Sequence, residues 1–312
     1  MSTGTLPAAT ARPPRRGRGT ARAANAPTRA PYAFIAPFYV LYLLFMVVPI
    51  LASLYLSLTE WVGLGTPSWV GLRNYGSLLT DSSFHKALVN TGVYVLVAVF
   101  VIVPISLLLA TALNARGLRA RDTFRVVYFV PMVVSPIVVA LIFSLVFDQQ
   151  FGLANAGLQA VFGAGGIDWL GDPWLAKLSI ALVTVWRWSG YLTIFFLAGL
   201  QNVPKDLYEA AALDGAGWWR SFTAVTLPAL RPVTAFVVVT SFISAAQIFD
   251  EPFLLTRGGP NDQTISVALF IYRAAFERQQ FGYAAAAGVV LFVVVFAISQ
   301  GFNRLLGIGR SS

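Results

Sequence analysis

The chain has 312 residues, of which 57% are hydrophobic and only 11% are charged. Ordinary soluble domains carry about 45 to 50% apolar and about 25% charged residues, so this composition excludes a soluble globular protein and indicates a membrane protein. The net charge is +9, and the absence of cysteine excludes disulfides and thiolate metal sites.

The amino-terminal tail, residues 1–31, is rich in Arg, Pro and Ala and carries six arginines with no acidic residue. It has too few apolar residues to form a core, so we expect it to be disordered. Six of the positive charges lie here. A role in setting the orientation of the chain in the membrane explains them better than nucleic-acid binding does. We therefore expect contact with membrane lipid and no nucleic-acid partner.

Long apolar runs follow the tail. A membrane span needs about 20 apolar residues, and five charge-free runs are that long. A sixth run is interrupted by Lys177 and Arg187. We predict an all-α, polytopic membrane protein in which residues 32–308 form one transmembrane domain. The six predicted spans are about 33–58, 87–114, 124–147, 175–200, 229–249 and 283–306.

Basic residues predict the orientation, because Lys and Arg accumulate in cytoplasmic loops. Like the tail, the loop between the second and third spans is basic, with four arginines between 116 and 125 against one aspartate. The connection between the third and fourth spans instead carries three aspartates between 148 and 172. We predict a multi-pass protein of the cell membrane with both termini in the cytoplasm, where residues 201–228 would also lie.

The predicted cytoplasmic loop has an unusual composition. Pro204 suits the first turn of a helix, and residues 205–217 supply helix formers that end in glycines. One face of this helix would hold Tyr208, Ala211, Ala212 and Gly215, which are small enough, apart from the tyrosine, to let another protein approach closely. The alternative is an amphipathic connector that lies on the lipid surface.

The motifs of this loop resemble those of a known family. Glu209, Ala210 and Ala211 are followed by Gly215 and by the segment 225–228 at the spacing of the E-A-A-x-x-x-G loop of permease subunits in ATP-binding cassette importers. Val225 stands where the family usually has Ile. The segment 254–260, Leu-Leu-Thr-Arg-Gly-Gly-Pro, is similar to a segment of carbohydrate-importing permeases of the maltose type. The resemblance covers about 33–306.

This resemblance implies a non-catalytic permease for a sugar, with di- or oligosaccharides expected. The implied partners are a second, different permease, an ATP-binding cassette ATPase dimer that uses ATP and Mg, and an extracytoplasmic sugar-binding protein. The loop would be a coupling helix seated on the ATPase. The expected ATPase-coupling residues are Tyr208, Glu209, Ala210, Ala211, Asp214, Gly215, Ala216, Gly217, Leu227 and Pro228.

Residue types argue against an enzyme. No lysine is followed by Ser or Thr in a Gly-Lys-Ser/Thr ending, so this chain lacks a phosphate-binding loop. His85 is the sole histidine, and without cysteine it cannot complete a zinc site of the usual kind. We expect no catalytic residue, no metal and no cofactor on this chain.

Arg187 is the main candidate in the spans, because a charge near the middle of a span costs about 2.5 to 3.5 kcal/mol. It would face the protein interior, where nearby aromatic residues could form a platform for a sugar. The alternative is a pair with a buried acid. In maltose-type relatives the spans flanking the loop contact the sugar, although Arg187 departs from their apolar residue and leaves an acidic substrate open. The predicted substrate-path residues are Arg187, Trp188, Tyr191, Ser244 and Gln247.

Two further predictions concern local structure. Pro131, Ser135 and Pro136 should kink or break the third span. The pattern of the segment 261–282 favours a helix on the external surface. Two other functions stay open, namely an importer permease for a non-sugar solute and a secondary transporter or channel, although the latter would favour charged relays or a long inverted repeat that the sequence lacks.

Overall fold

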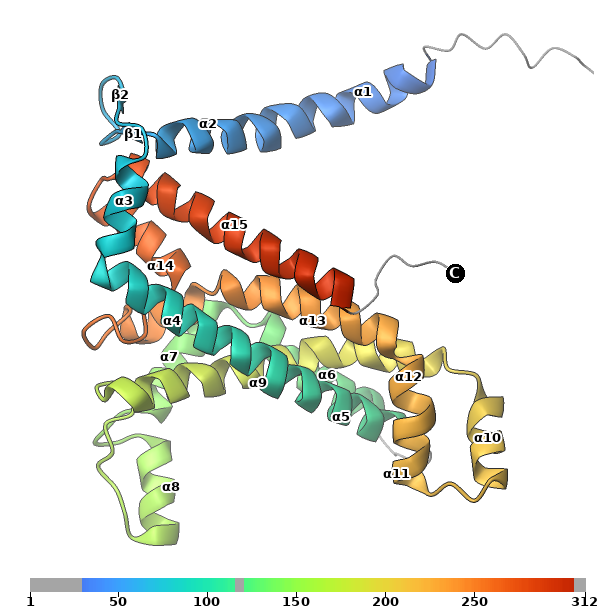
Figure 1. The fold of residues 1–312 in the computed structure, drawn as a ribbon. Coiled ribbons are helices and arrows are strands. Elements are labelled where there is room, and N and C mark those ends of the chain that lie inside the picture. The colour runs from blue at the N-terminus through green and yellow to red at the C-terminus, as the bar shows by residue number, and fades with distance from the viewer. Residues whose placement is uncertain (1–29, 116–120, 306–312) are drawn as a thin grey trace, which may run out of the picture. The chain divides into compact units, whose positions relative to one another are not determined.

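Long apolar helices dominate the fold (Figure 1). The computed structural model describes residues 30–115 and 121–305, and the chain divides into two units, 1–51 and 52–312. Within the described residues, four helices are long and apolar enough to cross a membrane, or up to six if each of two bent pairs is one span. The helical class is confirmed, whereas all but the last two residues of the predicted tail lie outside the described residues.

The described residues of the first unit, 30–51, are helical. Its side chains are apolar and exposed, as at Phe34 (87%) and Phe45 (72%), and none of its most apolar window is buried. The predicted span 33–58 is thus helical, and its surface has the character that lipid or another chain covers. It comprises α1 (Ala30–Tyr42), a π-helical turn (Leu43–Val47) and α2 (Val48–Ser57).

A short hairpin and helix follow α2. Thr59 pairs with Trp69 across the hairpin. The Asn74 side chain donates hydrogen bonds to the carbonyls of Ser57 and Thr59, both at 2.9 Å, and so fixes the start of the next helix against the end of α2. These elements are β1 (Thr59–Glu60), β2 (Ser68–Trp69) and α3 (Arg73–Thr80).

The second predicted span, 87–114, is a helix that begins earlier, at Ser82. The carboxylate of Asp81 accepts hydrogen bonds from the backbone N–H groups of Ser83 (2.8 Å) and Phe84 (3.2 Å). This cap stabilises a polar first turn that an apolar run does not reveal. The helix comprises α4 (Ser82–Val97), a π-helical turn (Ala98–Ile102) and α5 (Val103–Asn114).

The third predicted span is broken, which confirms the interpretation of its prolines. Ser135 is extended, and the helices on its two sides are bent by 97°. Pro136 starts the second helix, where its missing N–H costs nothing, and disfavours a helical residue before it. The pieces are α6 (Arg121–Val133) and α7 (Pro136–Val146), followed by the short α8 (Leu153–Phe162).

The helix α9 (Pro173–Gln201) packs against α5 and α6. The Ser106 hydroxyl of α5 lies 2.9 Å from the Ser189 carbonyl. At the next residue, a Cβ added to Gly190 would overlap the Tyr128 carbonyl of α6. Glycine is therefore required here, because the backbones of α6 and α9 touch.

The loop 201–228 contains short helices. The first ends at Leu213 rather than at 217, because Gly215 takes a left-handed backbone with φ of 72°. A bend of 70° separates the last of these helices from the next long one. The elements are α10 (Lys205–Leu213), α11 (Trp218–Ser221), a π-helical turn (Phe222–Thr226), α12 (Leu227–Ala229) and α13 (Arg231–Ala246).

The prediction of a surface helix in 261–282 is wrong. Its helical part is short, and Ile265, Val267, Leu269 and Phe270 are almost fully buried. Apolar residues on more than one face of this helix are covered by α4 and α15, whereas Phe276 is exposed. The elements are α14 (Val267–Tyr272), a π-helical turn (Arg273–Glu277) and α15 (Phe281–Leu305).

Candidate functional site

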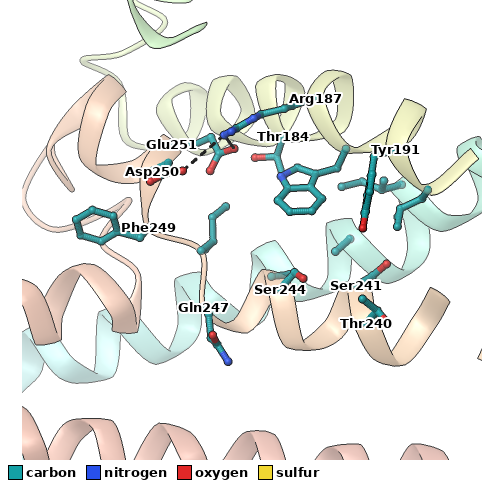
Figure 2. A pocket seen from close by; sticks show the side chains of 16 residues that line it. Thr184, Arg187, Tyr191, Thr240, Ser241, Ser244, Gln247, Phe249, Asp250 and Glu251 are labelled. Atoms are coloured by element: carbon teal, nitrogen blue, oxygen red, sulfur yellow. Dashed lines mark hydrogen bonds and ion pairs between the residues drawn. The ribbon is translucent and has the colours of Figure 1, made fainter. Parts of the chain in front are cut away.

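A cavity of about 300 Å³ lies between α9 and α13 (Figure 2). This volume is at the lower end of the range of small-molecule sites. All five predicted substrate-path residues line it, although the amide of Gln247 points away from the other labelled side chains in Figure 2. Its polar and aromatic lining consists of Thr184, Arg187, Trp188, Tyr191, Thr240, Ser241, Ser244, Gln247, Phe249, Asp250 and Glu251.

Arg187 meets two carboxylates at one end of this cavity. Its Nη1 lies 3.3 Å from Oε1 of Glu251 and 3.7 Å from Oδ2 of Asp250. Arg187 and Glu251 are 7% and 6% exposed, whereas the Asp250 side chain is 47% exposed. The predicted pair with a buried acid is thus present, and Arg187 lines the cavity as well. An ion pair with a buried acid and a position in the proposed substrate path therefore do not exclude each other for Arg187.

Two buried polar atoms in the lining have no hydrogen-bond partner among the described residues, namely Nε of Arg187 and Oγ of Ser241. Such an atom costs about 1 to 3 kcal/mol and calls for an explanation. The neighbouring hydroxyls of Thr184 and Thr240 differ, because each donates to a carbonyl of its own helix at 2.8 Å. Ser241 is not among the predicted substrate-path residues, and its burial distinguishes it from Thr240 and Ser244 on the same helix.

The aromatic residues near Arg187 divide into two groups. Trp188 and Tyr191 line the cavity and pack edge to face, with ring centroids 5.9 Å apart. Trp186 faces elsewhere, since its ring lies 5.2 Å from that of Phe143 on α7. The sugar platform expected from the sequence is therefore reduced to Trp188 and Tyr191.

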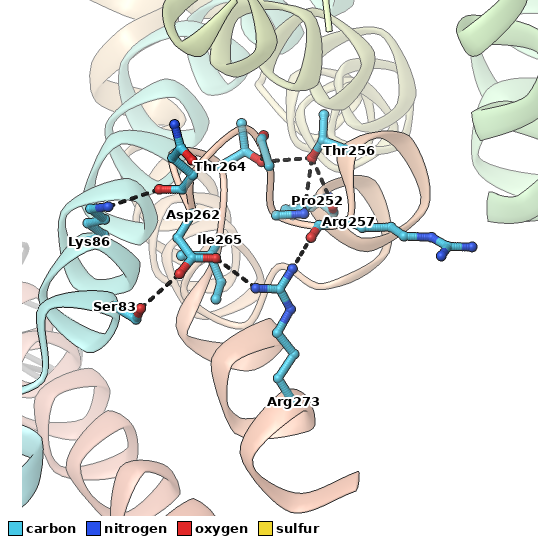
Figure 3. Close-up of polar contacts among 12 residues, drawn as sticks. Ser83, Lys86, Pro252, Thr256, Arg257, Asp262, Thr264, Ile265 and Arg273 are labelled. Atoms are coloured by element: carbon cyan, nitrogen blue, oxygen red, sulfur yellow. Dashed lines mark hydrogen bonds and ion pairs between the residues drawn. The ribbon is translucent and has the colours of Figure 1, made fainter. Parts of the chain in front are cut away.

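The segment after α13 also carries a polar cluster (Figure 3). The carboxylate of Asp262 accepts hydrogen bonds from Arg273 Nη1 (2.7 Å) and Ser83 Oγ (2.8 Å), while Lys86 donates to the Asn261 carbonyl (2.9 Å). Burial alone would raise the pKa of Asp262, but the hydrogen bonds from Ser83 and Arg273 outweigh it and lower that pKa. We call Ser83, Lys86, Asp262 and Arg273 the Asp262 cluster.

The same segment is held by further contacts within 252–264, the region of the Leu-Leu-Thr-Arg-Gly-Gly-Pro motif. Thr256 and Thr264 place their hydroxyls 2.7 Å apart. Arg273 also donates to the Arg257 carbonyl. The motif begins in a π-helical turn (Pro252–Thr256), and its contacts show that it is a packed structural segment.

The loop 201–228 presents a different surface. Within it, Tyr208 Oη and Thr226 Oγ1 lie 3.0 Å apart. Tyr208 and Ala211 are half-buried, but Ala212 and Gly215 of the same predicted face are exposed. Of the other predicted coupling residues, Ala216 and Leu227 are half-buried, and Glu209, Ala210, Asp214, Gly217 and Pro228 are exposed.

Aromatic rings mark the far end of this loop. Trp218 stacks on Phe222 with an angle of 9° between the rings, and Trp219 packs beside both. Phe222 is buried, whereas Trp218 and Trp219 are 63% and 65% exposed. Large exposed aromatic rings next to apolar helices are typical of a membrane interface or a protein contact.

Comparison with known proteins defines the family. The model of the binding-protein-dependent transport system inner membrane component matches residues 102–307. The chain is 36% identical over 280 residues to the arabinooligosaccharides transport system permease protein AraP of Bacillus subtilis, covering 89% of this chain and 88% of that protein. It is 38% identical over 272 residues to the lactose transport system permease protein LacF of Rhizobium radiobacter, covering 86% and 91%.

A solved structure shares the fold. One chain of a bacterial ABC transporter involved in the import of the acidic polysaccharide alginate superposes with a TM-score of 0.78, at 23% identity, covering 90% of this chain and 96% of that one. The long apolar helices and the matched family make this chain a multi-pass membrane protein. The chain belongs to the family of binding-protein-dependent transport system inner membrane components.

Proposed function

We propose that the chain is the permease subunit of an ATP-driven, binding-protein-dependent importer of sugars, with a di- or oligosaccharide as substrate. The observation that carries this proposal is the similarity, over nearly the whole of both chains, to permeases named for arabinooligosaccharides and for lactose. The permease itself is non-catalytic, and a separate ATPase hydrolyses ATP with Mg.

The proposed topology has six spans in which the bent pairs α6–α7 and α12–α13 each contribute to one crossing. Both termini then lie in the cytoplasm, because the arginine-rich tail and the basic loop 116–125 belong on that side. The loop 201–228 faces the cytoplasm as well, and the Asp262 cluster faces outward.

Coupling to the ATPase is assigned to α10 and the residues that follow it. The exposed side chain of Glu209 and the exposed backbone at Gly215 favour a contact with another protein. Movement of the ATPase dimer would reach α9 and α13 through the two ends of this loop. A second permease would complete the path, and an extracytoplasmic binding protein would deliver the sugar.

The cavity between α9 and α13 is the proposed substrate path. Its walls combine aromatic rings at Trp188 and Tyr191 with hydroxyl and charged groups. Aromatic faces stack on the apolar faces of sugars, and the polar groups can bond sugar hydroxyls. Both walls belong to helices that flank the coupling loop, which would link the cavity to the ATPase.

Co-purification from native membranes tests the function directly. The tagged chain should recover an ATPase, a second permease and ATP hydrolysis that neutral sugars stimulate in the presence of the binding protein. Recovery of these partners with stimulation by an amino acid or another non-sugar solute would change the substrate class. Recovery of the chain without an ATPase would overturn the importer proposal in favour of a secondary transporter or channel.

The substitution Glu209→Ala tests the coupling role. We expect normal folding and assembly but loss of most sugar-dependent ATP hydrolysis, since an exposed side chain contributes little to stability. Asp206→Ala is the matched control, because it removes an exposed acid from the same helix outside the motif. Equal coupling in the two variants would contradict the assignment of Glu209.

A further inference from the structure

The segment 250–267, which follows α13, is bonded along its backbone to α4. The Asn90 side chain donates hydrogen bonds to two carbonyls of the segment at 3.0 and 3.2 Å, and the Tyr94 hydroxyl donates to a third at 3.0 Å. The Thr91 hydroxyl accepts one from a backbone N–H group of the segment at 3.0 Å. The Asp262 cluster adds contacts to the same helix (Figure 3). We therefore expect α4 and this segment to move as one body.

The contacts between this segment and α9 are of a different kind. Leu255 lies in an apolar cluster with Val183 of α9, and packed apolar surfaces can slide past each other. In the described part of the chain, the polar contacts that join the segment to α9 are those of Arg187 with Asp250 and Glu251, and that of Lys177 Nζ with Gln263 Oε1 at 3.3 Å. The pair of Arg187 and Glu251 is therefore a buried ionic connection between two bodies.

This ion pair stands at one end of the cavity (Figure 2). With Asp250, its two residues also line a second, smaller space toward α7, so they form part of the wall between the two spaces. In the proposed topology this end of the cavity faces outward. Separation of the segment from α9 would open the cavity here. It would also leave two buried charges without their partners, which costs free energy.

We propose that the ion pair of Arg187 with Glu251, and Asp250 beside it, is a latch that holds the outer end of the cavity closed and keeps ATP hydrolysis low in the resting transporter. The inference rests on the proposed function as an ATP-driven importer. Closure of the ATPase dimer and opening of the outer end are then linked, and such linkage is reciprocal. A weaker latch therefore makes both events easier. This role is additional to the place of Arg187 in the wall of the substrate path.

The substitution Glu251→Gln tests the latch, because it removes the charge and keeps the size of the side chain. The measurement is ATP hydrolysis by the assembled transporter in lipid nanodiscs, without sugar and without the binding protein. We expect hydrolysis about tenfold faster than in the wild type, which corresponds to a latch that contributes about 1.4 kcal/mol. A residue with a merely structural role would lower activity or leave it unchanged.

The matched control is Asp262→Asn. Asp262 accepts hydrogen bonds from Arg273 and Ser83, and neither of these partners belongs to α9. This variant should lose stability, as Glu251→Gln should, but its resting ATP hydrolysis should equal that of the wild type. The comparison separates release of the latch from general loosening of the fold.

A crosslink tests the same division without weakening the fold. Cysteines replace Lys177 and Gln263, whose side chains meet across the gap between α9 and the segment, and a short reducible thiol crosslinker joins them. The native chain has no cysteine, and cysteines of the partner subunits are replaced. The crosslink should abolish sugar-stimulated ATP hydrolysis, and reduction should restore it. The control pair replaces Lys86 and Asn261, which meet within the body of α4 and the segment, and its crosslink should have no effect.

Each outcome decides for or against the latch. Unchanged resting hydrolysis in Glu251→Gln, or an equal rise in Asp262→Asn, would overturn it. If Glu251→Gln does not assemble, the crosslink decides, because persistent sugar stimulation in the crosslinked protein would show that the outer end need not separate from α9. Failure of the proposed function looks different, because the wild-type transporter would then lack an ATPase partner or show no stimulation by any sugar.

Discussion

The polar segment 250–264 and the loop 201–228 both carry family motifs, but they differ in how far contacts within the chain bury and bond their side chains. In the first, Glu251 is buried against Arg187 and Asp262 is bonded by Ser83 and Arg273. In the second, most motif side chains are exposed. A motif can therefore belong either to a packed intramolecular structure or to an exposed surface that is free to contact another molecule.

The largest expected effect comes from breaking the buried ion pair of the first segment. Glu251→Ala leaves the 7% exposed Arg187 without its nearest carboxylate, which should destabilise the protein by about 3 kcal/mol. Unfolding temperature in detergent measures the change. Asp250→Ala is the matched control, with a loss below about 1 kcal/mol because that side chain is 47% exposed. Similar losses of stability in both variants would show that burial does not determine how much Glu251 and Asp250 each contribute.

The second effect concerns the Asp262 cluster and depends on pH. Asp262→Asn should lower stability by about 2 kcal/mol near neutral pH, because two charge-assisted hydrogen bonds are lost. The folded protein lowers the pKa of Asp262 from its ordinary value of 3.8. Its contribution is therefore complete above that pH and disappears as pH falls through the lower folded pKa.

Thermal unfolding of the wild type and of Asp262→Asn across pH tests the direction of this pH dependence. The difference in unfolding temperature should stay constant between about pH 5 and 8 and shrink below about pH 4. Glu277→Gln is the control, since Glu277 contacts the same Arg273 at 3.9 Å but is 55% exposed. A difference that grows in acid would contradict the lowered pKa.

A smaller effect is expected in the exposed loop, where backbone conformation matters more than contacts. Gly215 has φ of 72°, yet a Cβ there would meet nothing within 4 Å. Gly215→Ala should therefore cost about 1 kcal/mol, from the left-handed backbone alone. Gly217→Ala should be neutral, because its space is equally open and its φ is −68°. Amide hydrogen exchange of α10 measures the change in stability in both variants. Equal exchange in the two variants would contradict the explanation that the left-handed backbone at Gly215 causes the loss.

The smallest effect should follow the loss of the contact between Tyr208 and Thr226. Tyr208→Phe removes one half-buried hydrogen bond of 3.0 Å and should cost about 0.5 to 1 kcal/mol. Local exchange of α10 should rise while the global unfolding temperature hardly changes. Thr223→Val serves as the control, because that exposed hydroxyl bonds only its own helix. A large global loss would mean that the loop is not the open region inferred above.

Local chemistry explains which features could be predicted from sequence. The break at Pro136 and the inward position of Arg187 follow from proline geometry and from the cost of a charge among apolar residues, and both were predicted. The family resemblance placed the five substrate-path residues on the two spans that flank the loop, and all five line one cavity, whereas their role in transport stays a prediction.

Contacts between distant residues explain what could not be predicted. Ser83 and Asp262 are 179 positions apart, so no spacing rule joins them. The burial of α14 was missed because its cover comes from α4 and α15. The early start of α4 depends on the cap at Asp81, a local signal that an apolar run overlooks. The absence of a partner for Ser241 is visible only after the helices are packed.

The contact between the backbones at Gly190 and Tyr128 has a mechanical consequence. Because the two backbones touch at this point, α6 and α9 should move together as one rigid unit, and the cavity should widen by movement of α13 instead. The chain contains no cysteine, so spin labels can be attached at chosen sites alone. During ATP turnover, distances between labels on α6 and α9 should stay fixed, while those between α9 and α13 change.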